Sequence, residues 1–264
     1  MEQSQDYDLQ RRFGGIARTY GAASLQRFMQ AHIAVIGVGG VGSWAVEALA
    51  RSGIGALTLI DLDNVAESNI NRQLVALDST FGMAKVEVLR RRVLEIHPTC
   101  QLTLVEDFVD LDNVPNLIHP SLAFVVDCID DARVKTALIA YCKRHKIRVI
   151  TLGGAGGQCD PSKIQLTDLA RSQHDPLLAR VRKQLRQDHH FPRNPKRRFE
   201  VPCVWSAEQM RFPTDDGALS PQRPVEASAS GLNCAGGLGS VMTVTASFAM
   251  LAVSHVLGKL AVTS

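Results

Sequence analysis

The chain of 264 residues lacks closely spaced cysteines, a large net charge and an apolar N-terminal segment. Of its six cysteines, even the nearest pair, Cys128 and Cys142, is too far apart for a CxxC motif, which excludes a zinc or thioredoxin-like centre of that type. A formal net charge of +3 does not by itself indicate a nucleic-acid partner. Because residues 1–15 contain no apolar core, we expect no secretion signal and a cytoplasmic protein with reduced thiols and no zinc.

Charged side chains are also absent from residue 235 until Lys259. A membrane span needs about 20 mostly apolar residues, so length alone permits one here. The run is interrupted by polar side chains, among them Ser240, Thr243 and His255. We therefore expect a final helix packed on the sheet of a globular domain and no membrane, although a hydropathy search would flag this segment.

Apolar strands and amphipathic helices alternate from residue 32 to about residue 160. Near-continuous apolar strands separated by helices are typical of a parallel sheet covered on both faces. We therefore predict an α/β fold with a doubly wound, Rossmann-like and mostly parallel sheet. The segments that predict strands are 32–37, 56–61, 101–109, 122–130 and 148–156, and those that predict helices are 43–53, 82–98 and 131–147.

After residue 160 the alternation loosens. A further strand is expected at 163–170, and a helix is expected to begin at Pro176 behind an Asp175 cap. The Pro-, Gly- and Ser-rich segment at 210–230 predicts a mobile loop. We predict a first domain at 1–160, which contains the alternating strands and helices, and an irregular C-terminal extension at 161–264, ending in the final packed helix, within the same globular unit.

A glycine-rich turn, GVGGVG, lies between the first predicted strand and the first predicted helix. In this motif the first glycine permits a tight turn, the second lets the backbone approach a phosphate, and the third allows close packing of helix and strand. Backbone N–H groups at the start of the helix then face the anion. Asp61 ends the second strand, where a carboxylate can accept ribose hydroxyls. A nucleotide site is therefore predicted at Gly37, Gly39, Gly40 and Gly42.

The residues that follow Asp61 favour ATP over a nicotinamide dinucleotide. A dehydrogenase does not need Arg72 and Lys85 so close behind the acid, whereas a triphosphate needs its charges neutralised by such groups. Asp130 follows a strand end, and a carboxylate beside bound phosphates is a natural Mg²⁺ ligand. The sequence thus predicts a site for ATP and Mg²⁺, which also includes Asp63, Asn69 and Gln73.

The motifs GVGGVG, LTLIDLDNVAESNINRQ, GMAK and DCIDD, in this order, resemble those of the ThiF/MoeB family, adenylating proteins related to ubiquitin-activating enzymes. The resemblance implies that a homodimer activates a carboxylate with ATP and releases pyrophosphate. It also implies that Gly39 and Gly40 contact phosphate and that Asp61 binds ribose. The residues implied to hold the triphosphate are Arg72, Gln73 and Lys85, and Asp130 is implied to bind Mg²⁺, with Arg72, Lys85 and Asp130 as the catalytic set.

Longer segments, such as TLGGAGGQCDPSKIQLTDLA and DPLLARVRKQLR, resemble one branch of this family, the tRNA threonylcarbamoyladenosine dehydratases. That branch cyclises the threonylcarbamoyl group on the adenosine beside the anticodon, in an ATP-dependent dehydration. The chain departs from many other members because it lacks their two CxxC pairs for zinc. It also has Gly15 where an N-terminal arginine would reach a partner subunit's ATP; Arg18 is either a substitute for that arginine or a surface residue.

Positive charge is concentrated between residues 180 and 198, where eight Lys and Arg residues accompany one acid, Asp188. Phe191 and Phe199 offer rings that stack on bases. The segment predicts a tRNA-binding surface, and the alternative is a solvated basic helix and loop. The predicted contacts are Arg186, Lys196, Arg197 and Arg198.

Two C-terminal cysteines, Cys203 and Cys234, are candidates for a thiol that accepts an acyl group or sulfur. Cys234 precedes a predicted helix, whose N-terminus lowers a thiol pKa, but free cysteines are commonly buried small hydrophobes and cyclisation needs no thiol. Whether the protein has a sulfur-transfer partner, such as a cysteine desulfurase or its acceptor, is therefore left open.

Backbone carbonyls at 153–157 could also hold a monovalent cation, K⁺ or Na⁺.

Three other functions compete with tRNA modification. The first is adenylation of the C-terminus of a ubiquitin-like or sulfur-carrier protein, which would use the same ATP site. The second is a catalytically inactive RNA- or partner-binding protein, against which Arg72, Lys85 and Asp130 argue. The third, an NAD-dependent oxidoreductase, would require tight binding of NAD.

Overall fold

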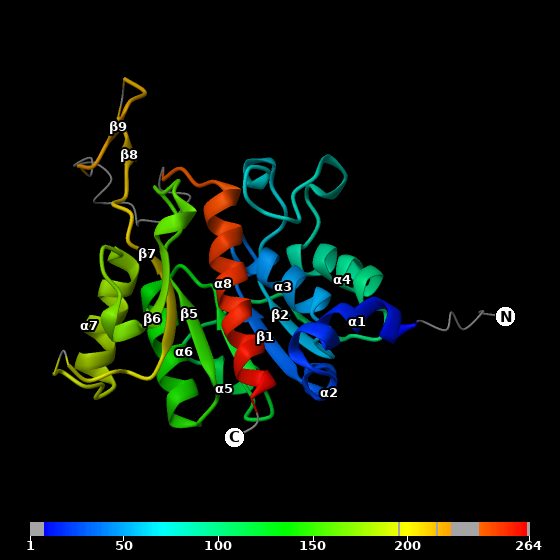
Figure 1. Ribbon diagram of the computed structural model, residues 1–264. Coiled ribbons are helices and arrows are strands. Elements are labelled where there is room, and N and C mark those ends of the chain that lie inside the picture. The colour runs from blue at the N-terminus through cyan, green and yellow to red at the C-terminus, as the bar shows by residue number, and fades with distance from the viewer. Residues whose placement is uncertain (1–7, 195, 215, 223–237, 263–264) are drawn as a thin grey trace.

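A seven-stranded sheet forms the centre of the molecule (Figure 1). This computed structural model describes residues 8–194, 196–214, 216–222 and 238–262. The strand order is β3-β2-β1-β4-β5-β7-β6, and all neighbours run parallel except β6, which is antiparallel to β7. The predicted doubly wound, mostly parallel sheet is confirmed. Its strands are β1 (His32–Ile36), β2 (Ala56–Ile60), β3 (Gln101–Val105), β4 (Phe124–Asp127), β5 (Val149–Leu152), β6 (Ile164–Asp168) and β7 (Pro202–Ser206).

Helices cover both faces of the sheet because each strand directs alternate side chains to opposite faces. In β1, Ile33 and Val35 belong to the core with α2, α3, α4 and α8, whereas Ala34 and Ile36 belong to the core with α5, α6 and α7. Two buried faces explain why β1 is continuously apolar. The helices are α1 (Leu9–Tyr20), α2 (Ala22–Gln30), α3 (Gly42–Arg51), α4 (Lys85–Ile96), α5 (Val114–Leu117), α6 (Ala132–Arg144), α7 (Pro176–Asp188) and α8 (Met242–Ala261).

Helix α8 is the apolar C-terminal segment. Within the described ranges it is the one helix long and apolar enough to cross a membrane, and half of its most apolar window is buried inside the protein. Phe248, Ala252 and Val256 are completely buried, and the helix packs against α2, α3 and the strands β5, β6 and β7. The structure confirms the predicted final helix and its packing on the sheet (Figure 1).

Helix α7 begins where the sequence predicted. Pro176 occupies its first turn, and the Asp175 side chain accepts a hydrogen bond from the Leu178 N–H. Asp131 caps α6 in the same way, accepting from the N–H groups of Arg133 and Val134. Both caps satisfy backbone donors that a helix start leaves without partners.

Several elements were not expected from the sequence, among them the short helix α5. Helices α1 and α2 precede the first strand, and β7 (Pro202–Ser206) lies between β5 and β6 in a stretch that was assigned no structure. Residues 164–168 and 202–206, both beyond residue 160, are thus strands of the same sheet as β1 to β5. In the predicted loop at 210–230, the described part forms a small antiparallel pair, β8 (Phe212–Pro213) and β9 (Leu219–Ser220).

Candidate functional site

A large cavity opens at the carboxyl edge of the parallel strands, with a volume of about 870 Å³. Such an edge is where ligands bind in open α/β sheets. Its walls come from the ends of β1, β2, β4 and β5 and from the starts of α4, α6 and α7. Of the residues predicted to bind nucleotide, the cavity is lined by Gly37, Gly39, Gly40, Asp61, Asp63, Asn69, Arg72, Gln73, Lys85 and Asp130.

The glycine turn connects β1 to α3 along one wall. Gly37 has a φ of +79°, and a Cβ there would lie 3.1 Å from the Cys128 carbonyl oxygen. Gly42 does not line the cavity; a Cβ at this position would lie 1.9 Å from the Gly37 carbonyl oxygen, so only glycine allows α3 to start here. Gly39 and Gly40 leave the backbone accessible to the cavity, as an anion-binding turn requires.

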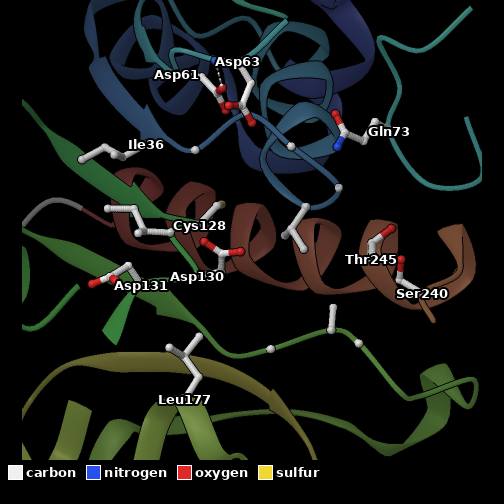
Figure 2. Close-up of a pocket in the computed structure, with 18 of the residues that line it drawn as sticks. Ile36, Asp61, Asp63, Gln73, Cys128, Asp130, Asp131, Leu177, Ser240 and Thr245 are labelled. Atoms are coloured by element: carbon white, nitrogen blue, oxygen red, sulfur yellow. Dashed lines mark hydrogen bonds between the residues drawn. The ribbon is translucent and has the colours of Figure 1, made fainter. Parts of the chain in front are cut away.

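Asp61 and Lys85 form a charged group beside this turn. The Asp61 carboxylate accepts hydrogen bonds from the N–H groups of Val38 (2.7 Å) and Asp63 (2.9 Å). Lys85 Nζ lies 2.7 Å from Asp63 Oδ2 and 3.9 Å from Asp61 Oδ1, although the Lys85 side chain is almost buried. Burial raises the pKa of Asp61, and the Lys85 charge opposes that rise. Figure 2 shows Asp61 and Asp63 side by side at the cavity wall.

Arg72 and Gln73 lie at the opposite side of the glycine turn. Arg72 Nη1 donates to the Ser68 carbonyl (2.8 Å) and to Asn71 Oδ1 (2.9 Å), which fixes the guanidinium at the rim. Gln73 is buried, and its Oε1 has no hydrogen-bond partner within the described residues. A buried polar atom without a partner at a cavity wall is a position for a ligand or a water.

Asn69 has a mainly structural environment. Its Oδ1 accepts a hydrogen bond from the Ala66 N–H at 3.0 Å, which closes a short 3-10 turn. Its backbone N–H donates to the Ala66 carbonyl and its carbonyl accepts from Arg72 and Gln73, so the side-chain nitrogen remains the group that can face a ligand in the cavity.

Three carboxylates, Asp127, Asp130 and Asp131, lie at the end of β4 or just after it, and their surroundings differ. Asp127 is completely buried and accepts hydrogen bonds from Lys135 Nζ (2.8 Å) and Thr151 Oγ1 (2.7 Å). Asp131 is the α6 cap. Within the part of the chain that the structure describes, the Asp130 carboxylate makes no hydrogen bond or ion pair, and Figure 2 shows it between Asp61 and Leu177. Asp130 is therefore the acid of this group that can serve a ligand.

The second wall of the cavity was not predicted as part of the nucleotide site, although the carbonyls at 153–157 were considered for a monovalent cation. It consists of Gly153, Gly154 and neighbouring residues together with Asp175, Leu177 and Met210. Asp175 Oδ2 accepts from the Gly154 N–H at 2.9 Å, so the α7 cap also fixes the loop after β5. Burial raises the pKa of Asp175. The sequence signals were the cap before Pro176 and the glycines at 153–157, but neither indicates that the two segments meet.

The cysteines have very different environments. Cys203 lies in β7 with no exposed surface, and burial raises its pKa well above the ordinary value, which contradicts its candidacy as a nucleophile. Cys159 is exposed and contacts the guanidinium of Arg211. Cys234 lies outside the described residues, so its predicted role stays a prediction.

Alkylation rates are expected to follow these environments. At pH 8, iodoacetamide should modify Cys159 faster than Cys100 or Cys142 by at least about 100-fold, because burial raises the pKa of the latter two to about 12 and blocks access. Peptide mass spectrometry over a time course in the folded and the urea-unfolded protein measures this. Equal rates in the folded protein would contradict the described burial.

The predicted RNA contacts lie away from the cavity. Lys196, Arg197 and Arg198 are exposed. Arg186 is already engaged, because its guanidinium lies 5.1 Å from the centre of the Phe199 ring and donates to the Pro192 carbonyl at 3.3 Å. Phe199 is only 3% exposed, so the expectation that its ring stacks on bases is wrong; it is a core residue.

Comparison with known proteins identifies the family. A family model described as the ThiF family matches residues 10–263. The chain belongs to the ThiF family. It is 49% identical over 249 residues to the tRNA threonylcarbamoyladenosine dehydratase of Escherichia coli, covering 94% of this chain and 93% of that protein.

Solved structures of ThiF-family relatives agree. The structure of the E. coli dehydratase in complex with ATP superimposes with a TM-score of 0.84 at 47% identity, covering 95% of this chain and 94% of that one. The same enzyme in complex with AMP gives the same values. Within the described residues, no three His, Cys, Asp or Glu side chains cluster as a metal site.

Proposed function

We propose that this ThiF-family chain is an ATP-dependent tRNA threonylcarbamoyladenosine dehydratase. It would adenylate the threonyl carboxylate of N6-threonylcarbamoyladenosine next to the anticodon and then close the ring. The observation that carries this proposal is 49% identity to an enzyme of that name along almost the whole of both chains. The cavity adds a glycine turn, two cations and a free carboxylate at the sheet edge where a nucleotide would bind.

The chemistry requires activation because a carboxylate is a poor electrophile whose leaving group would be oxide. Attack of the carboxylate on the α-phosphate of ATP forms an acyl-adenylate and releases pyrophosphate. The neighbouring carbamoyl group then attacks the acyl carbon, AMP leaves, and one proton is lost. The net change in the substrate is the loss of one water, and no step requires a thiol.

The residues at and beside the glycine turn fit ATP. Gly39 and Gly40 offer backbone N–H groups to phosphate, and Arg72 and Lys85 neutralise its charge. Lys85 is held in place by Asp63, so little side-chain entropy is lost when it meets a phosphate. Asp61 would accept ribose hydroxyls, and the unpartnered Oε1 of Gln73 gives the nucleotide a further polar contact.

Asp130 fits Mg²⁺, because it presents an oxygen ligand to the cavity beside the proposed phosphate position. When bound, Mg²⁺ would stabilise the charge that develops on the phosphates.

The carbonyls at 153–157 remain a proposed K⁺ or Na⁺ site. A homodimer, a cytoplasmic location, a sulfur-transfer partner and tRNA contacts at Arg186, Lys196, Arg197 and Arg198 also remain proposals, as does the division into 1–160 and 161–264 within one unit.

ATP–pyrophosphate exchange tests the function. The purified chain is supplied with radioactive pyrophosphate, ATP and Mg²⁺, and with either threonylcarbamoylated tRNA or a sulfur-carrier protein that ends in Gly-Gly. We expect exchange with the modified tRNA and the loss of one water from its modified nucleoside, detected by mass spectrometry. Unmodified tRNA is the control. Exchange with the carrier protein alone would establish the alternative function and refute ours.

A further inference from the structure

Helices α6 and α7 connect the cavity to a basic surface at the other end of the molecule. Asp131 and Val134 at the start of α6, and Pro176 and Leu177 at the start of α7, line the cavity. The helices pack together, and Thr136 Oγ1 donates to Gln184 Oε1 at 2.8 Å. Each contains 13 residues, so their far ends lie about 20 Å from the cavity wall. Figure 1 shows both on the same side of the sheet.

The far ends are strongly positive. Lys143, near the end of α6, contacts Glu200 at 3.3 Å, so the segment after α6 lies beside the segment that follows α7. The exposed acids in 143–148 and in the described part of 180–200 are Asp188 and Glu200, and Lys143 neutralises the second. The exposed cations at the far ends of the two helices and in the segments that follow them, which we call the α6–α7 basic surface, are Arg144, Lys146, Arg148, Arg193, Lys196, Arg197 and Arg198.

The described part of this surface presents no fully exposed large hydrophobic side chain. The large hydrophobic side chains exposed in the described residues include Phe108, Leu219 and Met250, but none lies in 132–148 or 176–200. A membrane-binding surface inserts apolar side chains, and a protein interface is centred on buried aromatic or aliphatic anchors. Cations without apolar anchors instead match a regular array of phosphates, which is bound mainly through charge.

We infer that the α6–α7 basic surface binds the sugar–phosphate backbone of the double-stranded stem of an RNA hairpin whose loop enters the cavity. This inference rests on the proposed function, which places a nucleoside of the loop at the cavity. It adds a division of contacts along two helices: the cavity recognises the modified loop nucleoside, and cations about 20 Å away bind stem phosphates. Arg144, Lys146 and Arg148, which the basic segment at 180–198 does not include, belong to the stem-binding group.

A charge-reversed variant tests this inference. R144E/K146E/R148E is compared with wild type and with R11E/K163E/K259E, which changes the net charge by the same amount at exposed positions elsewhere. The two probes are a synthetic anticodon stem–loop and the single-stranded loop oligonucleotide without its stem. Dissociation constants are measured at several salt concentrations by fluorescence anisotropy.

We expect the first variant to bind the stem–loop at least about tenfold more weakly at low salt, with the slope of log K against log salt reduced by about two to three. Its affinity for the loop oligonucleotide should stay within about twofold of wild type, and kcat at saturating tRNA should be unchanged while KM rises. An unchanged affinity for the stem–loop, an equal loss for the loop oligonucleotide or an equal loss in the control variant would each overturn the inference. Failure of wild type to bind any tRNA would instead refute the proposed function.

Discussion

Replacing Asp130 with asparagine is expected to lower the rate of ATP–pyrophosphate exchange about 100-fold or more. Asp130 is the carboxylate after β4 that faces the cavity without a partner in the described residues, and a neutral amide would bind Mg²⁺ much more weakly. The fold should be unaffected, because the side chain supports no other group. Exchange rates measured across a range of Mg²⁺ concentrations should show a higher requirement for the metal in D130N.

The adjacent residue provides a matched control. Asp131 also lines the cavity, but its carboxylate caps α6, and asparagine is an equally good cap. D131N should therefore retain nearly full exchange activity and stability. If D130N retained wild-type activity, or if D131N lost as much, the assignment of Asp130 to the metal would be wrong.

Replacing Lys135 with methionine is expected to destabilise the protein by about 3–5 kcal/mol. Lys135 and Asp127 are both completely buried, with Nζ 2.8 Å from Oδ2, so K135M would leave an uncompensated charge in the core. The free energy of unfolding, measured with urea, gives the change directly. By comparison, K143M removes one partner of an exposed ion pair with Glu200 and should cost about 1 kcal/mol or less.

A double variant separates charge from packing. In D127N/K135M no buried charge remains, so part of the lost stability should return even though the volume change is kept. If K135M alone does not fold, recovery of folded protein in the double variant still tests the pairing. A double variant no more stable than K135M would show that packing around Lys135, not its charge, is what matters.

The sequence predicted the part of the site that lies in continuous motifs. Gly37, Asp61 and Lys85 were found because the turn, the strand end and the following helix are adjacent in the chain, so their positions in the fold follow from local structure. Asp175 was missed as a site residue because its cap predicts only the start of α7. Its contact with Gly154 depends on where the start of α7 lies relative to the loop after β5.

Strand β7 was missed for a similar reason. PCVWS is short and follows a polar, basic segment, and nothing near it in the sequence shows that its partners are β5 and β6. Phe199 was assigned to the surface because of its basic neighbours, whereas the structure buries it against Arg186 and Phe191. Local composition cannot show which side of a basic segment faces the core.

The packing of α8 has a consequence for the order of folding. Helices α2 and α3 bury apolar side chains against α8, which comprises residues 242–261 and is therefore synthesised well after both of them. Until α8 leaves the ribosome, α2, α3 and the strands they cover have an uncovered apolar face, and β5 has no neighbour on its outer edge until β7 is made. The glycine turn and the strands around it are made early, but they reach their native packing only after residues 202–206 and 242–261 have been synthesised.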